Sequence, residues 1–224
     1  MDSFHFFDSG FKVLNGEVPF IDYWLVKGPL LDYIQAIFFY FFGISWWSYV
    51  LHASFINGIL TIFTFIVLKN YNLKSFYCFF YYLLFSILAY PSSGTPFIDH
   101  HSAFFSLLGI YSFLLVIKNN NKLYWYLIPI FFGFAFLSKQ VPASYIIILL
   151  SFVLILFSVI KKKISNIKYL LLGTFVFVII VFIFGIFQGI NFTSFLTQYF
   201  LYPKTIGAER FSNLDTSYKN IIGN

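Results

Sequence analysis

Six long apolar stretches, separated by short polar segments, dominate the hydrophobic pattern of the chain. A helix needs about 20 predominantly apolar residues to cross the hydrocarbon core of a bilayer, and somewhat fewer where the bilayer thins or flanking side chains snorkel to the interface. The pattern therefore predicts six membrane-spanning helices, at residues 46–68, 76–91, 101–117, 124–138, 142–160 and 169–189.

A seventh apolar stretch, residues 29–43, is shorter and contains Asp32 and Gln35. Such a run is more typical of an interfacial or re-entrant helix than of a spanning one, and we expect its two polar residues to face the headgroup side. Residues 1–28 are amphipathic and loop-like, with a short helix expected before Asn15-Gly16.

The composition agrees with a membrane protein and excludes a soluble one. Only 10% of the residues are charged and 60% are hydrophobic, whereas globular proteins carry about 25% charged residues. We therefore predict an all-α, polytopic integral membrane protein. The net charge of +6 comes from lysines in short loops, so nucleic acid is not an expected partner. Cys78 is the single cysteine, which excludes a disulfide framework within the chain and a cysteine metal site.

The lysines predict the orientation in the membrane, because basic loops favour the cytoplasmic side. Three alternate connections carry them: Lys69 and Lys74, Lys118 and Lys122, and Lys161 to Lys168. The remaining segments then face outward, provided that 29–43 does not cross. Three parts are expected: an outward first loop with juxtamembrane helices at 1–45, a six-span bundle at 46–189, and an outward segment at 190–224. The abrupt polar ends suggest a piece of a larger protein. We expect this protein to lie in a cytoplasmic (inner) membrane.

Residues 95–103 place an acid and two imidazoles at consecutive positions, Asp99-His100-His101, on the predicted outer side. One interpretation is structural: Asp99 caps a helix that begins at His100. The other is a metal or acid–base site, because carboxylate oxygen and neutral imidazole are common ligands of divalent metals. The two are compatible, and the stretch by itself does not decide between them.

An ordered set of short motifs resembles the GT-C superfamily of membrane glycosyltransferases, in its protein-mannosyltransferase and aminoarabinose-transferase-like branch. The set contains a first-loop acid, a Gly-x-x-Pro-aromatic-x-Asp segment, a Lys-Gly-Pro-Leu segment, a juxtamembrane Phe-Gly, a second-loop Asp and an outer Ser-Lys. These are Asp2, Gly16 to Asp22, Lys27 to Leu30, Phe42-Gly43, Asp99 and Ser138-Lys139. Each motif is weak alone, but their order and topology agree with the superfamily.

The resemblance implies an inverting transfer of a sugar from a polyprenyl-phosphate donor to a lipid, glycan or protein acceptor at the outer membrane face. Asp2 would be the catalytic base, and Asp99 would be a second catalytic carboxylate. Such a displacement needs a carboxylate for the acceptor proton and a cation near the leaving phosphate. Lys27 is the first candidate for that cation, followed by Lys139 and Arg210.

The oligosaccharyltransferase branch of the superfamily has a similar Asp-His-His loop, whose acid and second histidine help to hold a divalent metal. By that resemblance Asp2, Asp99 and His101 form a candidate metal triad for Mg²⁺ or Mn²⁺. Residues i and i+2 do not share a helix face, so Asp99 and His101 can bind one ion only if the stretch is still loop or cap.

Two departures from the family pattern weaken parts of this hypothesis. Asp2 is followed by Ser3 where many members have an acid pair, and Val26 stands where the aminoarabinose branch has a carboxylate. A transporter or flippase for a lipid-linked substrate is the alternative function, and a membrane scaffold is a third. The sequence shows no paired broken helices in two halves, which a transporter would favour, and the scaffold leaves the outward acids unexplained.

Overall fold

The computed structural model describes residues 4–89, 94–119, 121–162 and 164–206, and these residues are helical apart from turns and one isolated bridge between Pro19 and Tyr23. The all-α class is thereby confirmed. The helices are α1 (His5–Leu14), α2 (Leu30–Phe42), α3 (Trp46–Asn70), α4 (Ser75–Leu88), α5 (Ile98–Asn119), α6 (Lys122–Ser138), α7 (Gln140–Ile160), α8 (Ile167–Phe187) and α9 (Phe192–Leu196). A short 3₁₀ helix (Ile164–Asn166) precedes α8, and a π-helical turn (Thr197–Leu201) follows α9.

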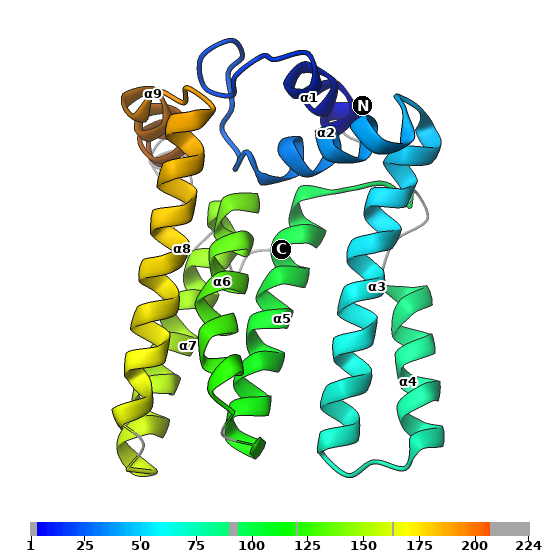
Figure 1. Ribbon diagram of the computed structural model, residues 1–224, viewed down its shortest axis with the longest axis vertical. Coiled ribbons are helices and arrows are strands. Elements are labelled where there is room, and N and C mark those ends of the chain that lie inside the picture. Colours follow the sequence, from blue (N-terminus) through cyan, green and yellow to red (C-terminus); the bar gives the residue numbers. More distant parts are fainter. Residues whose placement is uncertain (1–3, 90–93, 120, 163, 207–224) are drawn as a thin grey trace, which may run out of the picture.

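The six long helices α3 to α8 run roughly parallel to one axis, while α1 and α2 lie across one end of the bundle (Figure 1). The predicted apolar stretches thus each form a helix, and 29–43 forms the crosswise α2, as expected for an interfacial segment. Capping marks several boundaries: Ser45 and Ser48 form a reciprocal capping box at the start of α3, and the side chain of Asn121 caps α6.

Four helices are long and apolar enough to cross a membrane, namely α3, α5, α7 and the segment Ile164–Phe187. The other two predicted spans are shorter. Helix α4 has 14 residues and α6 has 17, which correspond to about 21 and 26 Å of rise against a hydrocarbon core of about 30 Å. Helix α6 packs between α5 and α8, so neighbouring helices lie beside it and compensate for its short length.

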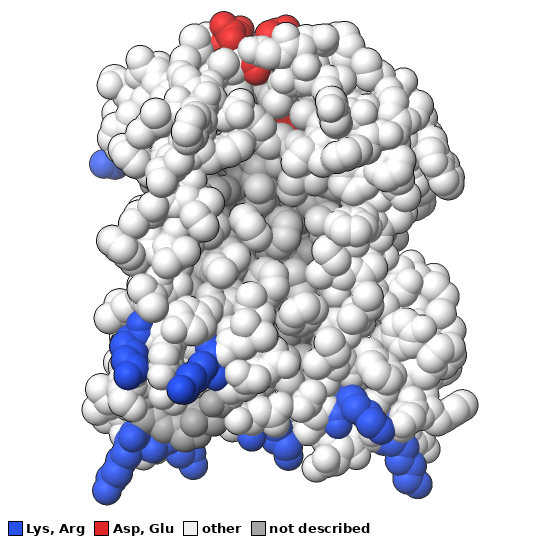
Figure 2. Space-filling model, in the orientation of Figure 1, with Lys and Arg blue, Asp and Glu red and all other residues white. Residues whose placement is uncertain are grey.

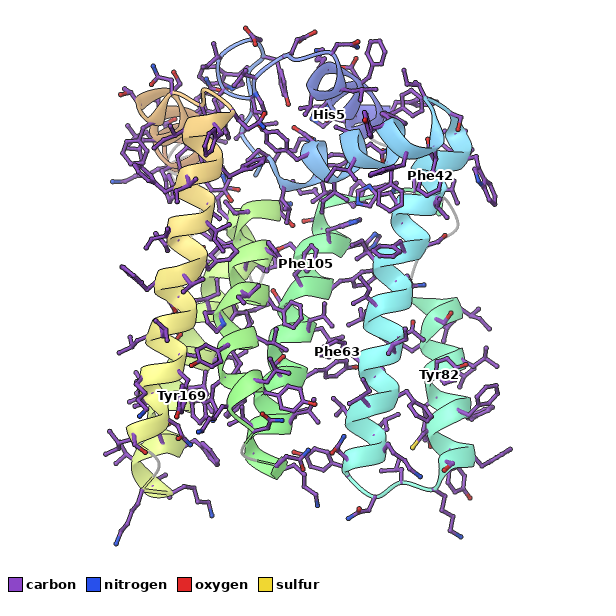
Figure 3. All side chains as sticks on the ribbon, in the orientation of Figure 1. His5, Phe42, Phe63, Tyr82, Phe105 and Tyr169 are labelled. Carbon is purple, nitrogen blue, oxygen red and sulfur yellow. The ribbon has the colours of Figure 1, made fainter. Side chains whose placement is uncertain are left out.

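Aromatic and aliphatic side chains fill the interior of the bundle. One cluster joins α3, α5 and α6 through residues such as Leu60, Phe105 and Ala135, and Figure 3 shows Phe63 and Phe105 between α3 and the helices beside it. A second cluster, around Trp125 and Phe132, joins α6 to α5 and α7. The faces of α7 and α8 away from these clusters expose many large apolar side chains, as a lipid-facing surface requires.

Charge is distributed unequally between the two ends of the bundle. Figure 2 shows acidic side chains at the end that carries α1 and α2 and most of the basic ones at the opposite end. We call these the α1–α2 end and the lysine end. The lysine end contains the turns between α3 and α4, between α5 and α6, and between α7 and α8, which are the three loops whose lysines predicted a cytoplasmic position.

Candidate active site

The loop between α1 and α2 is held in place by two glutamines that come from distant parts of the chain. The side-chain oxygen of Gln198, in the π-helical turn, accepts a hydrogen bond from the Leu25 amide at 2.8 Å, and its nitrogen donates to the Phe20 carbonyl at 2.8 Å. Gln140, at the start of α7, donates from its amide nitrogen to the Val26 carbonyl at 2.7 Å. The loop therefore enters the site with a defined backbone path.

Gly28 brings this loop against the end of α6. Its amide donates to the Ser138 carbonyl at 3.1 Å, and a Cβ at this position would lie only 1.6 Å from the Leu137 carbonyl oxygen. Glycine is thus required by a close approach of two backbones. The approach places Lys27 next to Ser138-Lys139, although these residues are more than 100 positions apart in the sequence.

Lys139 is the extended residue (φ −152°, ψ 134°) between α6 and α7, and its ammonium donates a hydrogen bond to Oδ1 of Asp99 on α5. The two side chains remain accessible, with exposed fractions of 36% for Lys139 and 46% for Asp99. The pair joins two of the residues predicted to form the site, and it leaves room for a ligand to reach both.

Lys27 lies beside a buried carboxylate, Asp32 of α2, at 3.7 Å between Nζ and Oδ1. Asp32 has no exposed surface and accepts hydrogen bonds from the hydroxyls of Ser9 (2.6 Å) and Tyr23 (3.0 Å). The expectation that Asp32 and Gln35 face the headgroups is therefore wrong. Both side chains are fully buried where α2 packs against its neighbouring helices, because α1 covers the polar face of α2.

The ammonium of Lys27 is buried but incompletely satisfied. It sits 3.2 Å from the centroid of the Phe6 ring, and its distance to Asp32 is too long for a hydrogen bond. Among the described residues it has no hydrogen-bond acceptor, although an ammonium carries three donors. Anionic oxygens of a ligand would supply the hydrogen-bond acceptors that these residues do not provide.

Burial and charge shift the pKa values of Lys27 and Asp32 in opposite directions. Burial lowers the pKa of Lys27 to about 8, against the raising effect of the Asp32 charge. Burial raises the pKa of the Asp32 carboxyl, and the nearby Lys27 charge and the two hydroxyl donors counteract this. Burial, and then the Asp32 charge, also raises the pKa of Tyr23, which therefore stays a neutral donor.

The predicted metal triad does not converge within the described residues. Helix α5 begins at Ile98, two residues before the predicted start at His100, so Asp99 lies inside the helix and is neither loop nor cap. Asp99 and His101 are therefore about 200° apart around the helix. Asp99 faces Lys139, whereas His101 is fully buried and its ring nitrogens contact the Phe97 carbonyl (3.0 Å) and Nε2 of His52 (3.2 Å).

No group of three potential histidine, cysteine or acidic ligands occurs in the described part of the chain. Asp99 and His101 therefore do not converge on one ion by themselves, and a Mg²⁺ or Mn²⁺ ion at this loop stays a prediction. Asp2 and Arg210 lie outside the described residues, so their roles as base, metal ligand and phosphate-binding cation stay predictions.

Sequence reasoning missed the residues that position this site, namely Ser9, Tyr23, Asp32, Gln140 and Gln198. For Asp32 a signal existed, because an acid inside a short apolar helix needs a partner when it is buried. For the two glutamines there was none, since their acceptors are backbone groups more than 50 residues away, and up to 178 residues away in the case of Gln198 and Phe20.

Comparison with known proteins agrees with the architecture. No curated protein and no solved structure matches the chain. One family model, dolichyl-phosphate-mannose-protein mannosyltransferase, matches residues 26–186 and so covers most of the sequence, including Lys27, Asp99 and Lys139. A transporter is disfavoured by this match. The chain belongs to the dolichyl-phosphate-mannose-protein mannosyltransferase family and is thus an integral membrane glycosyltransferase of the GT-C type.

Proposed function

We propose that this glycosyltransferase moves a sugar from a polyprenyl-phosphate donor to a lipid, glycan or protein acceptor, with inversion at the anomeric carbon, on the outer face of a cytoplasmic (inner) membrane. In this reaction a bond forms between the acceptor oxygen or nitrogen and the anomeric carbon. The bond from that carbon to the phosphate oxygen breaks, and the phosphate leaves with the electron pair. The acceptor proton passes to a carboxylate.

The unsatisfied ammonium of Lys27 is the observation that supports the proposal most directly. A buried cation with free donors favours a ligand whose oxygens carry negative charge, and the phosphate of a lipid-linked donor offers several. The neighbouring crosswise helix α2 lies where the headgroup of such a lipid would be, at the edge of the apolar bundle. As the phosphate leaves, it gains negative charge, and a cation already in place lowers the barrier.

Lys139 and Asp99 have complementary roles in this proposal. Lys139 is a second cation for the donor phosphate, and Asp99 orients it through their hydrogen bond. The same carboxylate is accessible to substrate, which suits the catalytic role predicted for it. Asp2 remains our candidate for the general base, and Arg210 for a third phosphate contact. No step of the proposed reaction passes through a metal ion.

The charge distribution supports the proposed orientation in the membrane. The lysine end would lie in the cytoplasm by the positive-inside tendency. Lys27, Lys139 and Asp99 would then lie at the opposite surface, because they belong to the α1–α2 loop, the α6–α7 connection and the first turn of α5. A lipid-linked donor that has reached the outer leaflet would meet the site there.

The test is transfer of radiolabelled sugar from polyprenyl-phosphate donors by the purified protein in lipid nanodiscs, beginning with mannose and continuing through a panel of other sugars. We expect Lys27→Met and Asp99→Asn to lower transfer by about 100-fold or more, as removal of a transition-state contact does. The matched controls are Lys12→Met and Asp8→Asn, because these residues form an exposed ion pair of 3.2 Å on α1.

Two outcomes would contradict the proposal. One is that the unaltered protein transfers no sugar from any lipid-linked donor in the panel. The other is that Lys27→Met and Asp99→Asn both transfer sugar at the rate of the two control variants.

A further inference from the structure

A buried chain of polar groups links α2, α3 and the first turn of α5. Gln35 lies 2.9 Å from Nδ1 of His52, Nε2 of His52 lies 3.2 Å from Nε2 of His101, and Nδ1 of His101 lies 3.0 Å from the Phe97 carbonyl oxygen. Gln35, His52 and His101 have no exposed surface. None of these contacts belongs to the Lys27 or Asp99 clusters, so the chain needs its own explanation.

The Phe97 end determines where the protons are. A carbonyl oxygen only accepts hydrogen bonds, so Nδ1 of His101 must carry hydrogen. In a neutral imidazole the other nitrogen is then an acceptor, and Nε2 of His101 presents a lone pair to His52. The contact between the two Nε2 atoms is therefore a hydrogen bond only if His52 carries its hydrogen on Nε2.

The Gln35 end follows from this assignment. With hydrogen on Nε2, a neutral His52 has a bare Nδ1, which needs a donor. As placed, the Gln35 oxygen faces this nitrogen, and the Gln35 amide nitrogen has no hydrogen-bond partner among the described residues. A half-turn of the amide exchanges its oxygen and nitrogen and makes the nitrogen the donor to His52.

The remaining arrangements place positive charge between the rings. If the Gln35 oxygen stayed against Nδ1, the two Nε2 lone pairs would need an extra proton or a metal ion between them. Either would be a cation in a site lined by Phe38, which stacks on His52, and by Phe105. No third ligand for a metal exists among the described residues. Burial of an unpaired cation is costly, whereas the neutral chain needs none.

We propose that Gln35 and His52 are positioning residues for the active site, acting through a neutral hydrogen-bond chain that runs from the Gln35 amide to His52, to His101 and to the Phe97 carbonyl. Because His101 is anchored on one side of the first turn of α5, Asp99 is held on the other side, toward Lys139. This inference rests on the proposed function only where it assigns Asp99 a role in transfer.

The primary test measures the positions of the protons and does not depend on activity. In ¹⁵N-histidine-labelled protein, assigned by single histidine-to-glutamine variants, we expect His52 protonated at Nε2 alone and His101 at Nδ1 alone. Gln35→Glu should move a proton to Nδ1 of His52, because a carboxylate offers no donor. A wild-type His52 protonated at Nδ1, a doubly protonated ring, or a bound metal ion would overturn the proposal.

The second test concerns transfer. We expect Gln35→Leu and His52→Leu to lower kcat by about three- to tenfold with little change in donor KM, because one hydrogen bond is lost at a distance from the donor. His52→Gln should restore part of the loss, since its amide can still donate to His101. Gln188→Leu, an exposed glutamine at the end of α8, is the matched control.

The two proposals fail separately. If the unaltered protein transfers no sugar from any lipid-linked donor while the predicted protonation pattern is observed, the proposed function fails and the chain stands. If Asp99→Asn abolishes transfer but His52 carries its hydrogen on Nδ1, the chain is wrong and the proposed function stands. Unchanged kcat in both Gln35→Leu and His52→Leu would contradict the positioning role.

Discussion

Gly28→Ala is the substitution whose effect follows most directly from the structure. The added Cβ would lie 1.6 Å from the Leu137 carbonyl oxygen and 2.2 Å from its carbonyl carbon. Ordinary contact needs about 3.5 Å, so the loop or the end of α6 has to move by about 2 Å. Neither partner can rotate away, because both colliding atoms belong to the backbone. The shift would also break the hydrogen bond from Gly28 to Ser138.

The expected cost has two parts. Loss of the hydrogen bond lowers the free energy of unfolding by about 1 kcal/mol, and overpacking lowers it further by about 1–3 kcal/mol. We therefore expect a total loss of about 2–4 kcal/mol. Because Lys27 is the preceding residue, a backbone shift of this size also displaces the proposed phosphate contact, and misplacement by about 1 Å costs on the order of 100-fold in rate.

Tryptophan fluorescence during thermal or denaturant unfolding in nanodiscs measures the first effect, and transfer from a lipid-linked sugar measures the second. Gly58→Ala in α3 and Gly185→Ala in α8 are matched controls, because a Cβ at either position meets no atom within 4 Å. They should be neutral or stabilise by about 0.5–1 kcal/mol through helix propensity. The reasoning is refuted if Gly28→Ala unfolds like these controls and retains their activity.

Three further changes test the charge and hydrogen-bond arrangement. Asp32→Asn removes the charge that raises the pKa of Lys27, so that pKa should fall below about 8. Transfer that needs the ammonium form is lost as pH rises through this pKa, and the pH–rate profile should therefore shift to lower pH; an unshifted profile contradicts the pairing. Gln140→Leu removes two hydrogen bonds of 2.7 and 2.8 Å and should lower the free energy of unfolding by about 1–3 kcal/mol, measured by denaturant titration. Lys139→Met should leave thermal stability within about 1 kcal/mol, because its ion pair is half-exposed, yet lower transfer at least tenfold. Lys12→Met should change neither, and an equal loss of transfer in both variants would argue against a specific role.

Much of the fold could be predicted from local pattern alone. Length and apolarity are sufficient to locate a helix in a membrane, because a buried backbone must satisfy its own hydrogen bonds. For the same reason residues 29–43 could be separated from the spans. The distribution of lysines between alternate loops likewise predicted which ends of the helices lie together, and the two ends of the bundle differ in charge as expected.

The site was only partly predictable. Lys27, Asp99 and Lys139 could be proposed from motifs, and the structure places Lys139 against Asp99 and the backbone of Lys27-Gly28 against Ser138. The predicted partnership of Asp99 with His101 depended on loop geometry. Once α5 begins at Ile98, the helical repeat points the two side chains in opposite directions.

The sequence by itself determined the helices, their order and the polarity of their ends, because these depend on composition and on neighbours within a few residues. Tertiary structure alone decided that Asp32 is buried beside Lys27, that Gln140 and Gln198 hold the first loop, and that His52 meets His101. The physical reason is that an apolar helix in a membrane can rotate about its axis at little cost in hydrophobic burial. Its rotation is determined by packing and by a few polar contacts between distant segments, and local sequence patterns do not predict these contacts.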